Sequence, residues 1–383
     1  MVKLWNGPAG GVFVLNVDNP KAPGPPFHMT VRQFDRTGRF IRAFGRGGQG
    51  PGEFASTVRD VDYLPDGRVL VLDPSGVHVY SPTGEPLDFW RAGRSVGRLH
   101  VDRTAGRVLL QGDSQVVGLQ GRAAGPPRPF IYRLRFDGTM DASPIVVARR
   151  PEARPDVEFP YPPRVGNISL PFAPRHIDAW SPIGYFVTAY TGTYAVDLRV
   201  PPEPSRASGA MWATGDPVRS IRRAAPPVPV AQREHGDWEQ SIVWYHRSLR
   251  SSPNWEWTGP PLPTVKPPIR DLLVSAEGRI WVRISQPGQL NPSVSIRTRA
   301  ASRSEWNEID AGRRWPEPWV FDVFEPTGVY VGQVRVPGDA GPQHFAHPGY
   351  AIQGDTLWGV VHDQDGVPSV KRYRVNWPTG VRR

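Results

Sequence analysis

The residues in this sequence that could act together in chemistry are histidines and aspartates near the starts of predicted strands. Aligning these strands on the glycine turn that follows each one brings four side chains to equivalent positions, with a fifth close to register. They are Asp60, His100, His176, Asp271 and His347. Imidazole nitrogens and carboxylate oxygens are common ligands of divalent metals, and a carboxylate between them could serve as a base. If the strands converge, the pattern predicts one divalent metal.

Basic residues stand beside these candidate ligands and would oppose a bound cation. Arg59, Arg98, Arg175 and Arg270 each lie within two residues of one of them, so a solvated or anion-attracting site is the alternative. We find no G-x-S-x-G elbow and no clear pair of nucleophile and base. The absence of Cys excludes a disulfide scaffold, a zinc–thiolate site and a cysteine nucleophile. A non-catalytic protein is favoured over a metal-dependent enzyme.

Residues 58–91 show the kind of element that must position these side chains. Four short stretches with apolar residues at every second position are separated by Pro-Asp-Gly, Asp-Pro-Ser-Gly and Pro-Thr-Gly turns, which predicts a four-stranded up-and-down sheet. The pattern recurs, and such sheets bury both faces only by stacking around a central channel. We therefore predict an all-β fold, a single six-bladed β-propeller. Its blades cover about residues 1–54, 55–96, 97–149, 175–224, 269–337 and 344–383.

Two segments of the first two copies resemble a known repeat family. Phe34–Phe54, which ends in Phe-Gly-Arg-Gly-Gly-Gln-Gly-Pro-Gly-Glu-Phe, and the following Val61–Asp73 look like the NHL-type six-bladed β-propellers common among bacterial exported proteins. The resemblance is weaker in the later copies, where long insertions interrupt it. It implies a propeller that binds something, in a family that covers lyases, lactonase-like hydrolases, sensors and scaffolds. The activity is left open, and a metal-dependent lyase or lactonase-like hydrolase at the channel mouth is the alternative reading.

The two ends of the sequence bear on where the protein resides. Only Val381–Arg383 remain to build the outer strand of the last blade, and the chain starts directly at the inner strand of the first. We expect either an open, three-stranded last blade or a longer native protein whose upstream part carries an export or lipid-anchor signal. The second case predicts a peripheral protein of the periplasm or cell envelope. If Met1 is the true start, the prediction is cytoplasmic.

The up-and-down order of strands within a blade predicts that the long insertions gather on one face of the propeller, which we call the decorated face. We refer to this alternation of connections between the two faces as the parity rule. Short turns connect the first strand to the second and the third to the fourth, so they lie on one face. The long connections fall mostly on the other face, which is where a rigid scaffold carries its functional loops. They are residues 112–128, 150–174, 225–268 and 286–318.

The insertion at 225–268 is rich in Pro and Trp and contains a predicted short helix. Asp237 and Gln240 resemble a capping box, and apolar residues follow at helical spacing, so we predict an amphipathic helix over 237–250. It could be a lid packed on the propeller or a partner-binding helix. Aromatic residues in or beside these insertions are candidate anchors for a protein partner. They are Trp238, Trp244, Trp255, Trp257 and Trp306.

Net charge and hydropathy limit the classes of partner that we expect. The net charge is +10, but it comes from 42 Arg and only 4 Lys scattered singly among acids, with no nucleic-acid-binding motif, so nucleic acid is not expected. No apolar run is long enough for a transmembrane segment. We therefore predict a non-catalytic binding or scaffold propeller without a cofactor. Family habit suggests an accessory subunit of a membrane-associated assembly, such as a respiratory or photosynthetic complex.

Overall fold

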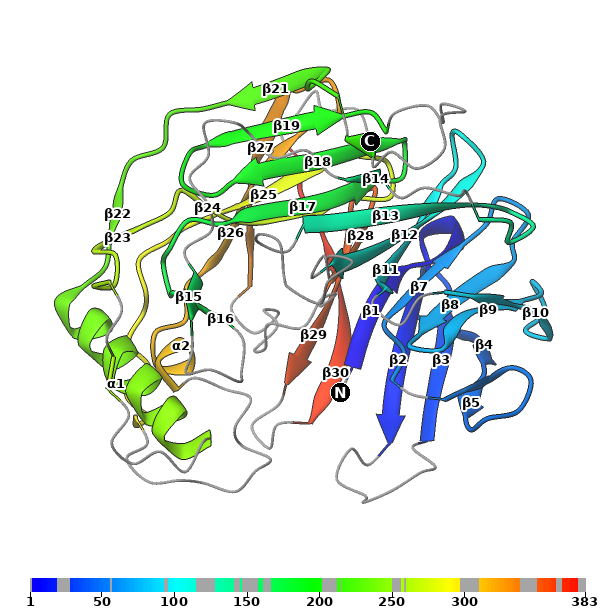
Figure 1. The fold of residues 1–383 in the computed structure, drawn as a ribbon, viewed down its shortest axis with the longest axis horizontal. Coiled ribbons are helices and arrows are strands. Elements are labelled where there is room, and N and C mark those ends of the chain that lie inside the picture. Colours follow the sequence, from blue (N-terminus) through cyan, green and yellow to red (C-terminus); the bar gives the residue numbers. More distant parts are fainter. Residues whose placement is uncertain are drawn as a thin grey trace, which may run out of the picture.

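The protein is a six-bladed β-propeller, as predicted, and its sheets follow one another around a central axis (Figure 1). The computed structural model describes most of the chain in segments. They are residues 2–18, 28–55, 57–92, 96–114, 128–140, 145–146, 158–160, 167–201, 212–213, 215–249, 256–257, 260–296, 310–337, 350–362 and 367–377.

Blades I to III each contain four antiparallel strands in sequence order. Blade I consists of β1 (Val2–Asn6), β2 (Val12–Asp18), β3 (His28–Phe34) and β4 (Phe40–Phe44). Blade II consists of β7 (Asp60–Tyr63), β8 (Val69–Asp73), β9 (Gly76–Tyr80) and β10 (Pro86–Arg91). Blade III consists of β11 (Val96–Asp102), β12 (Arg107–Ser114), β13 (Arg128–Arg135) and β14 (Ile145–Val146).

Blades IV and V repeat this plan, and blade VI has three strands in the part of the chain that is described. Blade IV consists of β17 (His176–Ser181), β18 (Tyr185–Tyr190), β19 (Ala195–Arg199) and β21 (Arg219–Arg222). Blade V consists of β24 (Ile269–Val274), β25 (Ile280–Ile284), β26 (Trp319–Phe324) and β27 (Tyr330–Val336). Blade VI consists of β28 (Tyr350–Gln353), β29 (Thr356–His362) and β30 (Pro368–Arg374).

Short strand pairs, two α-helices and the 3-10 helix Pro8–Gly10 occupy the described parts of the connections. The pairs are β5 (Arg46–Gly47) with β6 (Glu53–Phe54), β15 (Glu158–Pro160) with β16 (Asn167–Ser169), and β22 (Val228–Pro229) with β23 (Val265–Lys266). The helices are α1 (Gln232–Leu249) and α2 (Asp310–Arg314). In addition, β20 (Trp212–Ala213), from the connection between β19 and β21, pairs in parallel with β14 of blade III. This connection is the one long insertion that departs from the parity rule.

Blade II shows why these sequences form strands. Every residue of β8 and β9 is buried, because the middle strands of a blade contact neighbouring blades on both faces. The turn between β7 and β8 ends at Gly67, whose φ of +86° favours glycine and whose N–H bonds to the Leu64 carbonyl at 2.9 Å. Stretches with apolar residues at every second position, bounded by such turns, therefore identify the strands of each blade.

The hydrophobic core is divided into clusters that lie between adjacent blades. Blades I and II share Phe13, Phe44 and Phe54, for example, and blades V and VI share Trp281 and Phe321 with Ile352. The ring closes through a cluster that joins Leu4 and Val14 of blade I with Trp358 and Val360 of blade VI. Each blade is thus held mainly by its two neighbours.

The structure corrects the predicted helix. Helix α1 begins at Gln232, five residues before the expected start at Asp237, and its first turn includes a bond from the His235 N–H to the Ala231 carbonyl at 2.9 Å. Asp237 is therefore inside the helix and not its cap. A second helix, α2, was not expected from the sequence.

Regarding membranes, no helix in the described part of the chain combines the length and apolar character needed to cross a bilayer.

Candidate docking face and inner ring

The inner strands place three aspartates, and not the predicted mixture of Asp and His, at equivalent positions. Asp60, Asp178 and Asp271 each lie three residues before the last paired residue of their strand, and Lys3 occupies the same place in blade I. His100 is one residue closer to the turn, and His176 is two residues farther away than Asp178.

Unequal turns explain only part of this error of register. Between the paired ends of the first two strands lie five residues in blade II, four in blade III, three in blade IV and five in blade V. The turn glycine follows the last paired residue by four positions in blades II, III and V and by three in blade IV, so alignment on it displaces blade IV alone, by one residue. His100 and His176 each lie one residue away from the position that this alignment gives, because the neighbouring histidines were chosen. Alignment on the pairing partners would have found Asp178.

Asp60 and Asp178 bind neighbouring blades. The Asp60 carboxylate accepts the Leu99 N–H of blade III at 2.7 Å and the Val61 N–H at 3.0 Å. Asp178 accepts the side-chain amide of Gln111 from blade III at 2.7 Å. These carboxylates satisfy polar groups between blades, so they stabilise the ring.

His100 is likewise part of an inter-blade network. Its Nε2 lies 3.3 Å from Oε1 of Gln111, and since Gln111 donates its amide to Asp178, Nε2 must donate to this oxygen. Burial, helped by the charge of Arg98, lowers the pKa of His100 to about 3. The ring also stacks on Trp180, with centroids 6.4 Å apart. A nitrogen that carries a donated proton cannot ligate a metal at the same time.

No group of three or more His, Asp or Glu residues within the described segments could hold a metal ion. His176 packs its ring against Tyr190 at 5.1 Å, and Asp271 accepts the Leu272 N–H at 2.9 Å. His347 lies outside the described residues. The structure thus does not gather the described candidate ligands. The expectation of no cofactor, and the alternative of one divalent metal, are both open to a test by elemental analysis of the purified protein.

The basic residues beside the ring also connect blades. Arg59 donates to the Val96 carbonyl, Arg98 donates to the Asp178 carbonyl at 3.3 Å, and Lys3 donates to the Val58 carbonyl at 3.2 Å. Burial lowers the pKa of Lys3, although Asp60 opposes this. Arg59, Arg98 and Lys3 therefore have a structural role between blades.

Asp60 is expected to make stability depend on pH. Burial raises its pKa to about 7, with the Leu99 N–H acting against this and Asp62 adding to it. Because the carboxyl group ionises near pH 4 in the unfolded chain, the free energy of unfolding should fall as pH rises from about 4 to about 7. The effect should not exceed about 2 kcal/mol, because Asp60 keeps part of its surface in solvent.

Urea unfolding of the protein and of Asp60→Asn across this pH range measures the Asp60 effect. Asn keeps an acceptor for the Leu99 N–H but cannot ionise, so the fall in stability should shrink in the variant. Identical slopes in both proteins would contradict the assignment.

On the decorated face of the propeller, one side of helix α1 packs against the rest of the molecule. Its buried or half-buried positions follow helical spacing, and polar residues alternate with apolar ones along this stripe. Those whose side chains are described are Glu234, His235, Asp237, Trp238, Ser241, Ile242 and Val243. The opposite side is exposed, at Gln232, Arg233, Gly236, Glu239 and Gln240. The helix is therefore a lid with one face fixed to the molecule.

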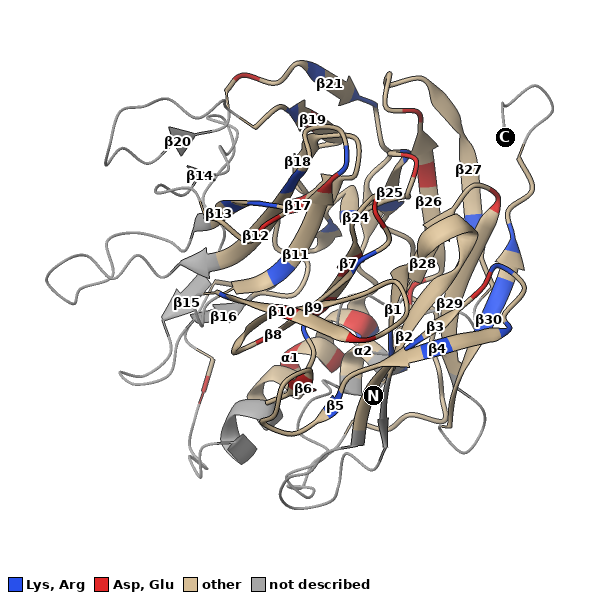
Figure 2. Cartoon of the chain, turned by 90° about the vertical axis from the view of Figure 1, so that its right-hand side faces the viewer, with Lys and Arg blue, Asp and Glu red and all other residues tan. Residues whose placement is uncertain are grey.

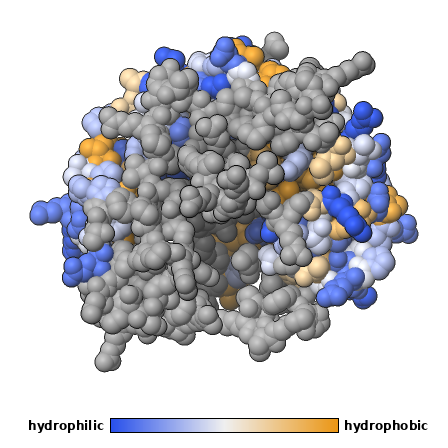
Figure 3. Space-filling model, in the orientation of Figure 1, coloured by the Kyte–Doolittle hydropathy of each residue, from blue (hydrophilic) through white to orange (hydrophobic). Residues whose placement is uncertain are grey.

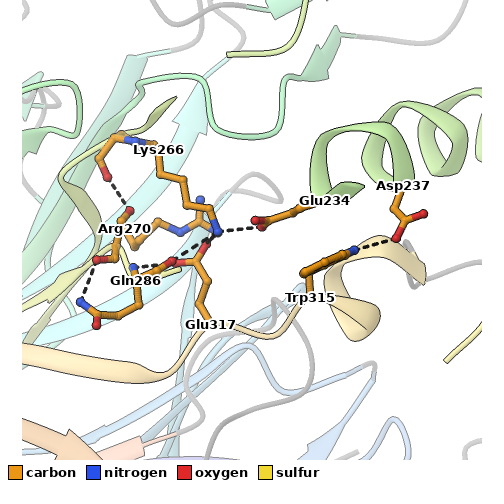
Figure 4. Close-up of polar contacts among 9 residues, drawn as sticks. Glu234, Asp237, Lys266, Arg270, Gln286, Trp315 and Glu317 are labelled. Atoms are coloured by element: carbon orange, nitrogen blue, oxygen red, sulfur yellow. Dashed lines mark hydrogen bonds and ion pairs between the residues drawn. The ribbon is translucent and has the colours of Figure 1, made fainter. Parts of the chain in front are cut away.

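Asp237 and Ser241 fix α1 to the insertion that follows β25. The Asp237 carboxylate accepts Nε of Arg314 at 2.8 Å and the indole N–H of Trp315 at 2.7 Å, the second of which is drawn in Figure 4. Ser241 accepts the Ala311 N–H at 3.2 Å. Polar groups thus hold α1 and α2 together.

Glu234 fixes α1 to blade V through a buried cluster of charges (Figure 4). Nζ of Lys266 lies 2.7 Å from Glu234 and 3.0 Å from Glu317, and its side chain is 0% exposed. Arg270 approaches Glu317 at 3.7 Å. Burial would raise the pKa of Glu317, but Arg270 and Lys266 hold it below its ordinary value. Gly288 allows this approach, because a Cβ there would lie 2.7 Å from the Glu234 carboxylate.

An apolar core lies beneath the helix and joins several insertions. Trp238 and Ile242 of α1 pack with residues from the connections before β17, before β24 and before β26, which are Leu170, Phe172, Leu262 and Ala311. The rings of Phe172 and Trp238 meet edge to face at 5.5 Å. Phe172 holds a φ of +62°, which is strained for a bulky residue and is kept by this packing. We call this unit, with α1 and α2, the insertion layer.

The predicted Trp anchors have different positions. Trp238 is only 8% exposed and belongs to the core of the insertion layer, so we no longer assign it to a partner surface. Trp257 is partly buried at the edge of that core and donates to the Pro260 carbonyl at 2.9 Å. Trp255 and Trp306 lie outside the described residues, as does the side chain of Trp244. Sequence spacing alone could not separate core from surface here.

Comparisons with known proteins add little beyond the fold. No protein-family profile matches the chain, and no curated protein matches it significantly. The chain is similar to a member of the DUF4221 family from Bacteroides vulgatus, with 10% identity, a TM-score of 0.45, and 98% of this chain and 92% of that chain covered. For Kuenenia stuttgartiensis hydrazine synthase the identity is 13%, the TM-score 0.36 and the coverage 93% and 72%.

A further similar structure is a protein described as a gluconolactonase, with 13% identity, a TM-score of 0.39, and 97% of this chain and 88% of that chain covered. Likenesses this remote carry no argument about function. The assignment to NHL-type repeats stays a prediction.

Proposed function

We propose that the protein is a non-catalytic binding or scaffold propeller that docks to another protein through its insertion layer. The observation that carries this proposal is that the layer has its own buried core, with Trp238 and Phe172 at its centre. Connections from blades III to V build this core, although the propeller cores between blades are separate from it. Long ordered connections are uncommon unless they serve a function.

The rigidity of the layer supports a docking role. Buried ion pairs at Lys266 and bonds to Asp237 hold α1 in one position, so its exposed side is presented without further ordering. A preorganised surface loses less entropy on binding. The exposed side of α1 offers Arg233, Glu239 and Gln240. A mixed polar surface of this kind is typical of the rim of a protein interface.

On the face drawn in Figure 3, described hydrophobic residues form small areas between hydrophilic ones. We extend the proposal to a partner in a membrane-associated assembly and to a peripheral location in the periplasm or cell envelope. This extension rests on the resemblance to exported propellers described above.

Site-specific crosslinking tests the proposal. A photoreactive residue at Arg233 or Gln240, on the exposed side of α1, should crosslink one defined protein in the native source. The same residue at Asp66 or Glu277, in exposed turns between first and second strands, should not capture it. Deletion of 231–258 is unsuitable, because it would remove Glu234 from Lys266 and expose the core of the layer. Equal capture from both faces, or capture from the turns alone, would contradict the proposal.

A further inference from the structure

A cavity opens between the outer strands of blades IV and V. Its volume is about 440 Å³, which is in the usual range of small-molecule sites. One wall is formed by β21 with the following Arg223, and the other by the end of β26, the turn after it and the start of β27. All lining residues belong to the described segments, and Arg223 and Tyr330 are exposed. Solvent therefore reaches the cavity.

The deep part of the cavity is apolar. Ile221 of β21 and Phe324 of β26 are buried and belong to the core between blades IV and V. The Tyr330 ring meets Phe324 at a centroid distance of 5.4 Å and is 44% exposed, so it lies nearer the solvent. An aromatic or aliphatic ligand body would replace water against these three side chains, and such burial of apolar surface is favourable.

Arg223 places a fixed positive charge beside these apolar side chains. Its Nη1 lies 2.8 Å from a carboxylate oxygen of Asp322, and its guanidinium carbon lies 4.6 Å from the centroid of the Tyr330 ring. Asp322 is held in turn, because it accepts the hydroxyl of Tyr194 at 2.7 Å and the amide of Gln333 at 3.3 Å. A guanidinium has five N–H groups on three nitrogens, so its bonds to Asp322 and Tyr330 leave donors for another acceptor.

The lining of the cavity carries positive charge and, among its described residues, no carboxylate. Arg222 and Arg223 are both exposed, and Figure 2 shows basic residues on β21. The Asp322 carboxylate lies behind the lining, where its side chain is only 3% exposed. Arg219 adds a further positive charge nearby and donates to the Thr327 carbonyl in the adjacent turn. This balance of charge favours an anionic ligand.

We propose that this cavity binds a small organic carboxylate with an aromatic or aliphatic body. The ligand carboxylate accepts charge-assisted hydrogen bonds from Arg223, while the body packs on Ile221, Phe324 and Tyr330. An inorganic anion offers no such body, and a neutral aromatic molecule offers no charge. In Figures 1 and 2, β21 lies far from α1, so this site is separate from the insertion layer and independent of docking through it.

Fluorine NMR tests the site on the whole protein. The probe is 4-fluorobenzoate, compared with 4-fluorobenzamide, which has nearly the same shape but no charge, and with sulfate as a competitor that has charge but no ring. We expect millimolar or tighter binding of the benzoate, at least about tenfold weaker binding of the benzamide, and no displacement by an equal concentration of sulfate. Equal binding of the benzamide, displacement by sulfate, or no binding of the benzoate would overturn the proposal.

Variants locate the site. Arg223→Gln should weaken binding of 4-fluorobenzoate by about tenfold or more, because Gln keeps a donor but not the charge. Tyr330→Leu removes the aromatic wall but keeps the pair of Arg223 with Asp322, and should weaken binding by about threefold or more. The matched control is Arg91→Gln, on the fourth strand of blade II, which should bind like the unmodified protein.

Circular dichroism and the unfolding midpoint show which of these variants fold. Tyr330→Leu keeps the test decisive if Arg223→Gln unfolds, because it leaves Asp322 with its charged partner. An unchanged affinity in either folded cavity variant, or an equal loss in Arg91→Gln, would contradict the assignment.

Discussion

Replacing Lys266 by methionine is expected to lower the free energy of unfolding by about 3–5 kcal/mol. The ammonium group is fully buried between Glu234 and Glu317, whose side chains are only 2% and 6% exposed. Methionine keeps much of the side-chain volume but leaves two carboxylates buried without this partner. The penalty comes mainly from these uncompensated charges, and urea unfolding measures it.

Two controls make the Lys266 prediction specific to buried charge. Glu239→Gln lies on the exposed side of the same helix, where its side chain is 54% exposed beside His235, and should change stability by less than about 0.5 kcal/mol. Adding Glu234→Gln and Glu317→Gln to Lys266→Met should recover much of the loss, because no buried charge of the trio remains. A loss below about 1 kcal/mol for Lys266→Met alone would mean that water reaches the cluster.

Trp238→Ala is expected to loosen the insertion layer and to lower its free energy of unfolding by about 3–5 kcal/mol. The indole is almost fully buried against Phe172 and Ile242, so truncation leaves a cavity in a small core. Because the cores between blades do not include Trp238, the propeller should stay folded. Hydrogen exchange should accelerate in α1 and around Leu170 and Leu262, while β8 and β19 remain protected.

Arg233→Ala is the matched control for Trp238→Ala, since it removes a large side chain from the exposed side of the same helix. It should leave exchange in the layer unchanged. If Trp238→Ala also leaves exchange unchanged, the indole is not a core residue. It would then return to the set of candidate anchors.

The spacing of apolar residues was sufficient to predict the fold, because each blade is built from strands that follow one another along the chain. In residues 58–91 the alternation and the turns together specify four strands, and the repeats demand a ring. The inner ring was harder, since register depends on turn length, and blades II, III and IV have turns of five, four and three residues. Alignment on the turn glycine displaces blade IV by one residue, onto Ile177, and the choice of the adjacent histidine then selected His176 in place of Asp178.

The start of α1 could not be predicted from local sequence because its polar residues have distant partners. Glu234 is bonded to Lys266, 32 residues away, and Asp237 to Arg314, 77 residues away. Seen alone, Asp237 has the residue type of a helix cap. Similarly, Trp238 has the residue type of an interface anchor. Only tertiary packing separates these roles, and one sequence does not record it.

The ring closes between blades I and VI, which are the first and the last of the described blades along the chain. Leu4 and Val14 meet Trp358 and Val360 there through side chains alone, and within the described segments no strand crosses from one blade to the other. The insertion layer braces a different arc, from blade III to blade V. We therefore expect a fluctuation that separates two adjacent blades to begin at this junction, because side-chain packing and not the continuous chain joins blades I and VI.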